Sequence, residues 1–344
     1  MPIPAHDSST TTPSTQAMGA LMQLAGGYAW SWLLYMAARL ELADHVAAGP
    51  HTVDALAKAC GADAGALRRL LDALDALGVL RRTEDGRFGP TPMSYWLRSD
   101  VAGSQRPLAL MAGDPRILQA WGGALEAVTT GGIAFERVHG RPFFEMLDGA
   151  PELARAFHEA GGVTPEWNEA MAEELDLTGC RTVVDVGGGD GSLVRALLAR
   201  RPELEAVVLE RPAAIEILAA RSGDVPWRWQ AGDFLDAVPA GADAYLLRRI
   251  LHDWDDARAL AILANVRAAI PTHGRLFVLE YLVRPEARAA SAMLDFTLFV
   301  LTGGRERGET EYRALLEAAG FALERVQWTP AGIDVMVARP VAAS

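Results

Sequence analysis

A β-branched run followed by four glycines is the feature that most constrains how this chain can fold. Residues 182–186 read Thr-Val-Val-Asp-Val and predict a short, buried strand of a parallel sheet. Glycines follow at positions 187, 188, 189 and 191, and a helical pattern of apolar residues begins at Leu193. Glycines allow a sharp turn and let a ligand approach the backbone closely. The stretch therefore predicts the first strand–turn–helix unit of a nucleotide-binding α/β sheet.

The charges around this loop indicate what kind of ligand it holds. The dinucleotide fingerprint G-x-G-x-x-G would place its third glycine where Ser192 stands. Asp185 and Asp190 put acids in and beside the loop, and no basic residue occurs there before Arg195. A ligand with a cationic centre and a zwitterionic end suits these acids better than a pyrophosphate does. We therefore expect S-adenosylmethionine (SAM), with a dinucleotide site and a glycine turn without a ligand as the alternatives.

The overall composition excludes several classes of partner. The net charge of −12 and the pI of about 5.1 argue against a nucleic-acid backbone or an anionic membrane as the main partner. Cys60 and Cys180 lie far apart and have no paired spacing, so neither a disulfide framework nor a zinc site is indicated. We expect no metal, a cytoplasmic location and, from the length of 344 residues, two domains.

The N-terminal stretch divides into a polar tail and an uncharged segment. Residues 1–16 are rich in Ser, Thr and Pro and predict a disordered tail. Residues 17–38 carry no charge over nearly the length of a membrane span, but Gln23, Gly26 and Gly27 interrupt them. We expect two helical pieces that bury against a partner rather than a membrane span.

Residues 52–91 have the pattern of a winged helix. Thr52 can cap one helix, Gly61 ends it, and a second helix runs to Gly78. A short hairpin follows over residues 79–91, with its turn at Asp85-Gly86. Acids and bases nearly balance here, whereas a DNA-binding domain needs a basic face. We therefore interpret residues 17–103 as a dimerisation domain and keep a DNA-binding regulator as a weaker hypothesis.

Residues 104–176 predict a helical bridge, and alternating strands and helices follow from residue 177. We expect parallel strands near 182–186, 206–210, 227–229, 243–247 and 275–280, a helix over 256–270 and another over 309–319. Residues 321–328 and 333–338 predict a closing antiparallel pair that turns at Pro330 to Gly332.

Polar side chains stand where each predicted parallel strand ends, which is the sheet edge where ligands bind. The strand-end residues are Asp185, Glu210, Asp233 with Phe234, Arg248 followed by His252, and Glu280. Each also has a structural interpretation: Glu280 could pair with Arg284, and Arg248 could be a surface charge. Their shared position at one edge favours a binding and catalytic role.

Three stretches, taken in order, resemble a known enzyme family. Asp185-Val-Gly-Gly-Gly-Asp-Gly191, Leu251-His-Asp-Trp-Asp-Asp256 and Gly303-Gly-Arg-Glu-Arg307 resemble the small-molecule O-methyltransferases of plant caffeate and flavonoid type. The likeness is closer to their bacterial relatives in aromatic polyketide and other antibiotic pathways, and it covers nearly the whole chain. The glycine motif alone indicates SAM binding with moderate specificity, and the three stretches in this order are a strong indication of the family.

The resemblance implies a fold and a dimer. It implies a Rossmann-like SAM-binding domain over residues 177–344, with a mixed seven-stranded sheet and helices on both faces. The winged-helix-like domain would form a homodimer, and the bridge would contribute to the substrate pocket. The acceptor would be an aromatic or polyketide-type small molecule, with S-adenosylhomocysteine as the product of the cofactor.

The resemblance also implies roles for individual residues. His252 is the expected general base, flanked by Glu280 and Glu306. The residues assigned to the cofactor are Asp185, Gly187, Gly189, Glu210, Arg211, Asp233, Phe234 and Arg248. Those assigned to the substrate pocket are Trp121, Phe143, Phe157, Trp167, Asp253, Met293 and Phe296. The alternative within the same family is an enzyme that keeps SAM but catalyses hydroxylation, decarboxylation or a pericyclic step.

Overall fold

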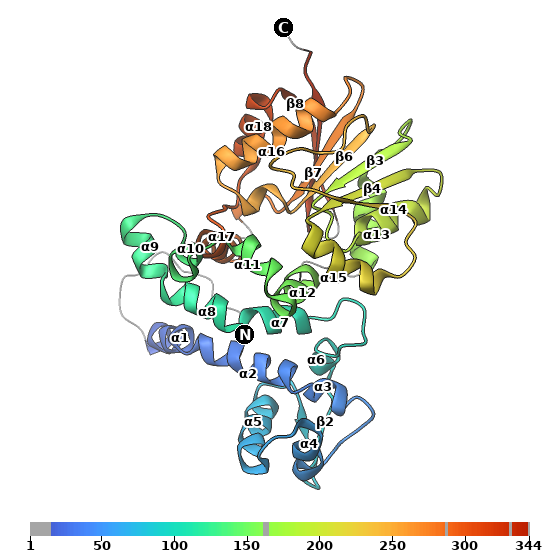
Figure 1. Cartoon of the computed structure of the whole chain (residues 1–344). Helices are drawn as coiled ribbons and strands as arrows, with labels where there is room; N and C mark the ends of the chain where they lie inside the picture. Colours follow the sequence, from blue (N-terminus) through green and yellow to red (C-terminus); the bar gives the residue numbers. More distant parts are fainter. Residues whose placement is uncertain (1–14, 161–164, 286–287, 330–331, 343–344) are drawn as a thin grey trace. The chain divides into compact units, whose positions relative to one another are not determined.

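The computed structural model describes residues 15–160, 165–285, 288–329 and 332–342, and the chain forms two compact units (Figure 1). The first unit ends at Asp114 and the second begins at Pro115. Residues 1–14 of the expected disordered tail lie outside the described residues. Thr15 and Gln16, which we had also placed in the tail, belong to the first helix.

The first unit contains the expected pair of apolar helices and the winged helix. Gly26 separates α1 from α2, so the two-piece prediction for residues 17–38 is confirmed. The first unit consists of α1 (Thr15–Ala25), α2 (Gly27–Arg39), α3 (Leu42–His45), α4 (Val53–Cys60), α5 (Ala64–Ala76), β1 (Arg81–Arg82), β2 (Phe88–Gly89), α6 (Pro92–Tyr95) and α7 (Arg106–Ala112). None of the described helices combines the length and the apolar character that crossing a membrane requires.

Capping residues fix the helices of the winged-helix region as the sequence indicates. Thr52 Oγ1 accepts a hydrogen bond from Ala55 N at 3.2 Å, and Asp63 Oδ1 accepts one from Ala66 N at 2.7 Å. Gly61 ends α4 with a left-handed φ of 64°. Leu56, Leu71 and other apolar residues of both helices then fill the core of this unit.

Helix α7 belongs to the first unit, although we expected residues from 104 onward to form the bridge. Arg106, at its start, donates from Nε to Ala38 O at 3.2 Å and from Nη2 to Glu41 Oε1 at 2.9 Å. At its end, a Cβ on Gly113 would lie 2.2 Å from Cγ of Tyr35, so the backbone packs directly on that ring. These contacts hold α7 on α2.

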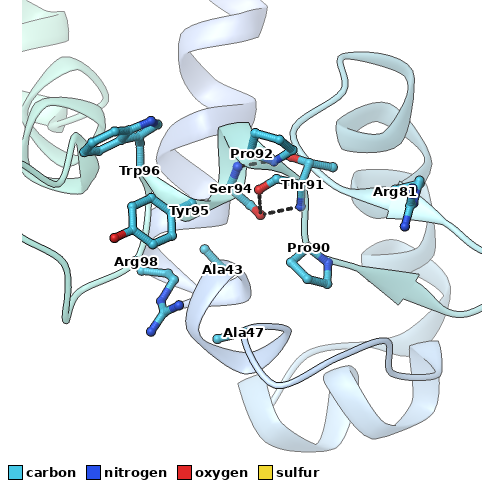
Figure 2. A pocket seen from close by; sticks show the side chains of 10 residues that line it. All are labelled: Ala43, Ala47, Arg81, Pro90, Thr91, Pro92, Ser94, Tyr95, Trp96 and Arg98. Atoms are coloured by element: carbon cyan, nitrogen blue, oxygen red, sulfur yellow. Dashed lines mark hydrogen bonds between the residues drawn. The ribbon is translucent and has the colours of Figure 1, made fainter.

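A cavity of about 590 Å³ opens beside α6 in the first unit (Figure 2). The ring of Tyr95 meets that of Trp96 edge-on at 5.2 Å, and the guanidinium of Arg98 lies 5.6 Å from the Tyr95 ring. Thr91 and Ser94 form a reciprocal capping box at the start of α6. The lining contains none of the residues expected in the active site.

The second unit begins with the helices of the bridge and continues into the sheet. The bridge helices are α8 (Pro115–Gly122), α9 (Ala124–Thr130), α10 (Ala134–His139), α11 (Phe143–Asp148), α12 (Pro151–Ala160) and α13 (Pro165–Glu174). They lie in the same compact unit as the sheet, and α13 packs against the first helix that follows the glycine loop.

The sheet has seven strands in the order β5-β4-β3-β6-β7-β9-β8. The strands are β3 (Thr182–Val186), β4 (Glu205–Glu210), β5 (Arg228–Ala231), β6 (Ala244–Arg248), β7 (Arg275–Glu280), β8 (Phe321–Trp328) and β9 (Asp334–Pro340). The first five are parallel, and β9 and β8 close the sheet in antiparallel fashion. The prediction of a mixed seven-stranded sheet is confirmed, whereas part of the predicted final turn, Pro330 and Ala331, lies outside the described residues.

Helices cover both faces of this sheet (Figure 1). They include α14 (Ser192–Arg200), α15 (Pro212–Ser222), α16 (Asp256–Ala269) and α18 (Glu309–Ala318), and a short 3₁₀ turn, η1, spans Leu251–Asp253. Helix α17 (Arg288–Leu301) instead contacts the bridge helices α8 and α10. Alternate strand residues point to opposite faces. Val184 and Leu247 therefore join a core with α16 and α18, whereas Val183 and Leu246 join one with α13 and α14.

Asp243 ties the start of β3 to the start of β6, and we predict that Asp243→Asn destabilises the protein by about 1–3 kcal/mol. Its Oδ2 accepts from Arg181 N at 2.7 Å and from Thr182 N at 3.1 Å, and Oδ1 lies 3.0 Å from His273 Nε2. These hydrogen bonds lower the pKa of Asp243 to about 2, and the bond from Arg181 N has the largest effect. Urea unfolding at neutral pH measures the loss.

Because the pKa of Asp243 is lowered on folding, its stabilisation is present above the ordinary value of 3.8 and is lost as pH falls through about 2. The difference between the two proteins should therefore shrink in that acid range. Asp236→Asn, at an exposed position, is the matched control and should change stability little. Equal unfolding midpoints for Asp243→Asn and the wild type would contradict the prediction.

Candidate active site

The glycine loop after β3 is open because side chains are excluded from it. Gly187, Gly189 and Gly191 have φ values of 67°, 56° and 71°, which favour glycine. A Cβ on Gly187 would lie 2.6 Å from Ile250 Cδ1, and one on Gly191 would lie 2.4 Å from Trp227 Cζ2. Nothing lies within 4 Å of the Cβ position of Gly189. The loop therefore packs tightly on the protein at two glycines and leaves the third accessible to a ligand.

Two carboxylates stand at this loop. Asp185 is fully buried, and neither of its oxygens has a hydrogen-bond partner among the described residues. Burial raises the pKa of Asp185 to about 6, against the opposing charge of Arg248. Glu210, at the end of β4, accepts from Gly189 N at 3.2 Å and from Arg211 N at 2.9 Å. An unpaired buried carboxylate is costly, so this site fits a ligand that carries a cationic group.

Arg248 and Phe234 complete the surroundings of the loop. Arg248 donates to Asn168 Oδ1 at 2.8 Å and to Ser192 Oγ at 3.5 Å, so it is not a solvated surface charge. The Cβ position of Gly187 lies 3.1 Å from Cε1 of Phe234. The exposed Asp233 accepts from Leu235 N at 2.8 Å. An aromatic face and a carboxylate are thus available beside the loop for a heterocyclic base.

We expected Arg211 to bind the cofactor, but its side chain contacts helix α11 instead. Its guanidinium donates to Phe144 O and to the carboxylate of Asp148, both in α11. Only the backbone of Arg211 meets Glu210. Arg211 therefore ties α11 to the end of β4, a tertiary contact that the sequence does not indicate.

His252 lies in η1, just after β6, and is 2% exposed. Its Nδ1 lies 2.8 Å from Glu306 Oε1 and 3.8 Å from Glu280 Oε2. Glu280 also accepts a hydrogen bond from the backbone N of His252 at 3.3 Å. The structure therefore brings together the imidazole and the two acids that sequence analysis grouped with it, and Glu306 makes the closest contact.

The acids make this imidazole a stronger base than a free histidine. Burial alone would lower the pKa of His252, but the charges of Glu280 and Asp253 and the hydrogen bond with Glu306 raise it to about 9. Burial raises the pKa of Glu280 to about 7, and the charge of His252 opposes that shift. An imidazole of this basicity is suited to taking a proton from a phenol, whose reference pKa is near 10.

The Gly303–Arg307 stretch supports the backbone on both sides of His252. Gly304 packs so closely that a Cβ there would lie 2.1 Å from His252 O, and Arg305 N donates to that oxygen at 2.8 Å. Arg307 is completely buried and donates to Leu251 O and Trp254 O, both at 2.8 Å. Sequence analysis quoted Arg307 in the motif but gave it no role; the structure shows that it holds both ends of η1.

The aromatic residues proposed for the pocket fall into two groups. Phe143 and Phe157 meet at 5.3 Å, and Phe144, which contacts both rings, stacks on Trp254 at 5.2 Å. Trp121 lies 5.6 Å from Phe296, which in turn meets Phe299. Met293 is 61% exposed and Trp167 is 44% exposed, so neither is part of the packed core.

Sequence analysis did not assign Trp254 to the pocket. Trp254 stands in the Leu251–Asp256 motif, beside the general base that we expected, and this position was the available signal. The stack places α11 against the segment that carries His252 and Asp253. Asp253 Oδ1 lies 3.8 Å from Nε2 of His252, on the side of the ring away from Glu306.

Comparison with known proteins identifies matching families for both parts of the chain. Residues 22–100 match the O-methyltransferase dimerisation domain, and residues 121–322 match the O-methyltransferase domain. Phenazine O-methyltransferase PhzM of Lysobacter antibioticus is 39% identical over 93% of this chain and 96% of that protein. O-demethylpuromycin-O-methyltransferase of Streptomyces alboniger is 39% identical over 92% of this chain and 87% of that protein.

Solved structures agree with this assignment. LaPhzM superposes with a TM-score of 0.89 at 39% identity, covering 96% of this chain and 100% of that one. An O-methyltransferase from neocarzinostatin biosynthesis, solved with SAM and 2-hydroxy-5-methyl naphthoic acid, has a TM-score of 0.76 and 29% identity, covering 96% of this chain and 100% of that one. The chain belongs to the family of O-methyltransferases that pair a SAM-dependent methyltransferase domain with a dimerisation domain.

Proposed function

We propose that this protein transfers a methyl group from SAM to a hydroxyl oxygen of an aromatic natural-product intermediate. The observation that carries the proposal is the buried His252, whose Nδ1 lies 2.8 Å from Glu306. Its Nε2 lies 3.8 Å from Asp253 Oδ1 and makes no hydrogen bond with a described residue. This arrangement leaves one ring nitrogen to accept a proton. Family membership supports the reaction class.

The residues around the glycine loop suit SAM. When bound, SAM supplies a methyl group made electrophilic by its sulfonium. Asp185 offers two unpaired oxygens to the cationic end of such a ligand, and Gly187 and Gly189 keep the loop backbone accessible. Glu210 would hold the ribose hydroxyls, and Asp233 and Phe234 would hold the adenine. Arg248 would support the loop through its contact with Ser192.

His252 would act as the general base. Its Nε2 takes the proton of the acceptor hydroxyl as the oxygen attacks, while Nδ1 donates to Glu306. Glu280 stabilises the charged imidazole and holds the backbone of the same residue. A base in this position contributes on the order of 10²–10⁴-fold to the rate, and positioning of the two reactants supplies much of the rest.

The acceptor that we propose is a hydroxylated aromatic compound. Phe144 stacks on Trp254, which stands two residues after His252, and the partly buried Phe157 contacts Phe144, so flat apolar rings lie near the base, whereas Phe143 is 2% exposed and belongs to the core. Similar proteins act on phenazines and O-demethylpuromycin by name, and one was solved with a hydroxynaphthoic acid. The placed base argues against a decarboxylation or pericyclic step, since neither needs a proton taken from a hydroxyl.

We further propose a cytoplasmic homodimer formed through the first unit. Helix α1 buries none of its residues, and Leu21 and Met22 are each 68% exposed. Tyr28, at 71%, continues this apolar surface into α2. Exposed apolar area of this kind is typical of an interface, and the match to a dimerisation domain supports a second copy as the partner. The proposal involves neither a metal ion nor nucleic acid.

The proposed reaction is tested by titration calorimetry with S-adenosylhomocysteine and by product mass spectrometry with a panel of hydroxylated aromatic compounds. We expect binding of the nucleoside and a product that gains one methyl group on oxygen. We expect His252→Ala to lose on the order of 100-fold or more in kcat while it still binds S-adenosylhomocysteine. His273→Ala, at a histidine whose side chain is 70% exposed, is the control. Failure of the wild type to bind the nucleoside would refute the proposal.

The pH dependence of kcat/KM should report the basicity of His252. The free imidazole must be neutral to accept a proton, so the rate should rise with pH through the raised pKa of about 9. Glu280→Gln removes one negative charge that raises this pKa, so the rising limb should move to lower pH. The exposed Glu324→Gln should leave it in place. An unshifted limb in Glu280→Gln would argue against His252 as the base.

Gly304→Ala should lower kcat by at least tenfold with little change in S-adenosylhomocysteine binding. The added Cβ would lie 2.1 Å from His252 O, which is backbone, so η1 must move and carry the imidazole away from Glu306. Gly122→Ala, where nothing lies within 4 Å of the Cβ position, is the matched control. Activity near the wild-type level in Gly304→Ala would show that the position of His252 does not depend on this contact.

A further inference from the structure

Two adjacent arginines at the end of β6 have different surroundings. Arg248 is paired with Asn168 and Ser192. Arg249 makes no side-chain hydrogen bond or ion pair with any described residue, and its Nε is buried without a partner. A buried polar group without a partner costs about 1–3 kcal/mol, and more when it is charged. The structure therefore leaves a cation at the ligand-binding edge of the sheet with an unfilled hydrogen-bond donor.

The backbone of Arg249 is strained. Its φ of 53° lies in the left-handed region, and among the described non-glycine residues only Glu41 shares this feature. Such a conformation costs on the order of 1–3 kcal/mol and persists where the surrounding structure enforces it. Here the backbone N of Arg249 donates to Leu279 O at 2.9 Å, so β7 holds the residue in place. Strain of this kind gathers at binding and catalytic sites.

Arg249 directly follows β6 and stands three residues before His252 in the sequence. Its Cζ is 5.8 Å from the ring centroid of Tyr281, the residue that follows Glu280. Burial raises the pKa of Asp253, and the charges of His252 and Arg249 oppose that shift. Arg249 also opposes the acids that raise the pKa of His252. The cation is therefore within electrostatic reach of both residues but pairs directly with neither.

We propose that Arg249 binds a carboxylate carried by the aromatic acceptor, so that the substrates are hydroxylated aromatic carboxylic acids. The inference rests on the proposed function and specifies its substrate class. A guanidinium presents parallel N–H donors that match the two oxygens of a carboxylate. The Tyr281 ring beside the guanidinium restricts its orientation. One end of the acceptor would meet Arg249 while its hydroxyl meets His252.

The rival explanation is that Arg249 only balances the negative charge of Glu280, Glu306 and Asp253. In that case its removal would change the basicity of His252 and affect every acceptor equally. A carboxylate-binding role instead predicts that the effect depends on whether the acceptor carries a carboxylate. Paired probes that differ in this one group therefore separate the two explanations.

The experiment measures binding of paired probes to the full-length enzyme saturated with S-adenosylhomocysteine. The probes are hydroxylated benzoic and naphthoic acids and their primary amides, titrated by calorimetry, which needs no turnover. The variants are Arg249→Asn, since asparagine tolerates the left-handed conformation, and Arg249→Lys, which keeps the charge. Arg258→Asn is the matched control, because Arg258 also lies over an aromatic ring, 5.7 Å from Trp254. Thermal unfolding and S-adenosylhomocysteine affinity verify that each variant is folded.

We expect the wild type to prefer at least one acid over its amide by roughly 10- to 100-fold, the range of a charge-assisted hydrogen-bond pair. Arg249→Asn should lose this preference for the acid, while its affinity for the amide stays within about threefold of the wild type. Arg249→Lys should keep part of the preference, and Arg258→Asn should keep all of it. The inference is overturned if the wild type prefers none of the acids, or if Arg249→Asn weakens both members of a pair equally. If the wild type does not bind S-adenosylhomocysteine at all, the proposed function itself is refuted.

Discussion

The arrangement of the site depends on the buried hydrogen bond between His252 and Glu306. The imidazole and the carboxylate come from segments separated by 54 residues, and both are buried. Their geometry is set by the backbone: Arg305 N donates to His252 O, and the segment at Gly304 packs directly on the segment that carries His252. Glu280 Oε2 and Glu306 Oε2 remain buried without a hydrogen-bond partner, so the cluster is costly to bury and the backbone around η1 must hold it in place.

Arg307 explains how a short 3₁₀ turn can hold a catalytic residue in place. A single 3₁₀ turn has little stability of its own. Arg307 donates to the carbonyl of the first residue of the turn and to that of the residue after it, and its charge is balanced by Asp256 at 2.7 Å. The arginine is completely buried, so replacing it would remove the side-chain donor to both carbonyls. The Gly303–Arg307 stretch, one of the three that resemble the family, therefore also supports the turn that carries His252.

Local features of the sequence predicted the sheet and placed His252 and Glu280 at one edge of it, because β-branched runs, glycine turns and strand ends are local signals. The pairing of Glu306 with His252 was instead implied by the family resemblance. Strands expected at 206–210, 227–229 and 243–247 occur at Glu205–Glu210, Arg228–Ala231 and Ala244–Arg248. Contacts between distant segments gave no such signal. The pairing of Arg211 with α11, the stack of Phe144 on Trp254 and the packing of α7 on α2 each depend on side chains far apart in the chain. Propensity and periodicity contain no information about which of these partners meet.

Arg248 and Arg249 show this limit at its sharpest, since the residue type is the same and the positions are adjacent. In an extended strand they would point to opposite faces, and sequence alone would assign both to the same polar edge. The left-handed φ of Arg249 ends the strand instead, while its backbone remains bonded to β7. Arg248 therefore bonds to Ser192 at the end of the glycine loop. Arg249 retains a buried Nε donor that has no hydrogen-bond partner among the described residues. A strained backbone beside an unpaired cation is hard to account for by folding stability alone, since both raise the free energy of the folded state, and an anionic group on the acceptor is the partner that would offset them.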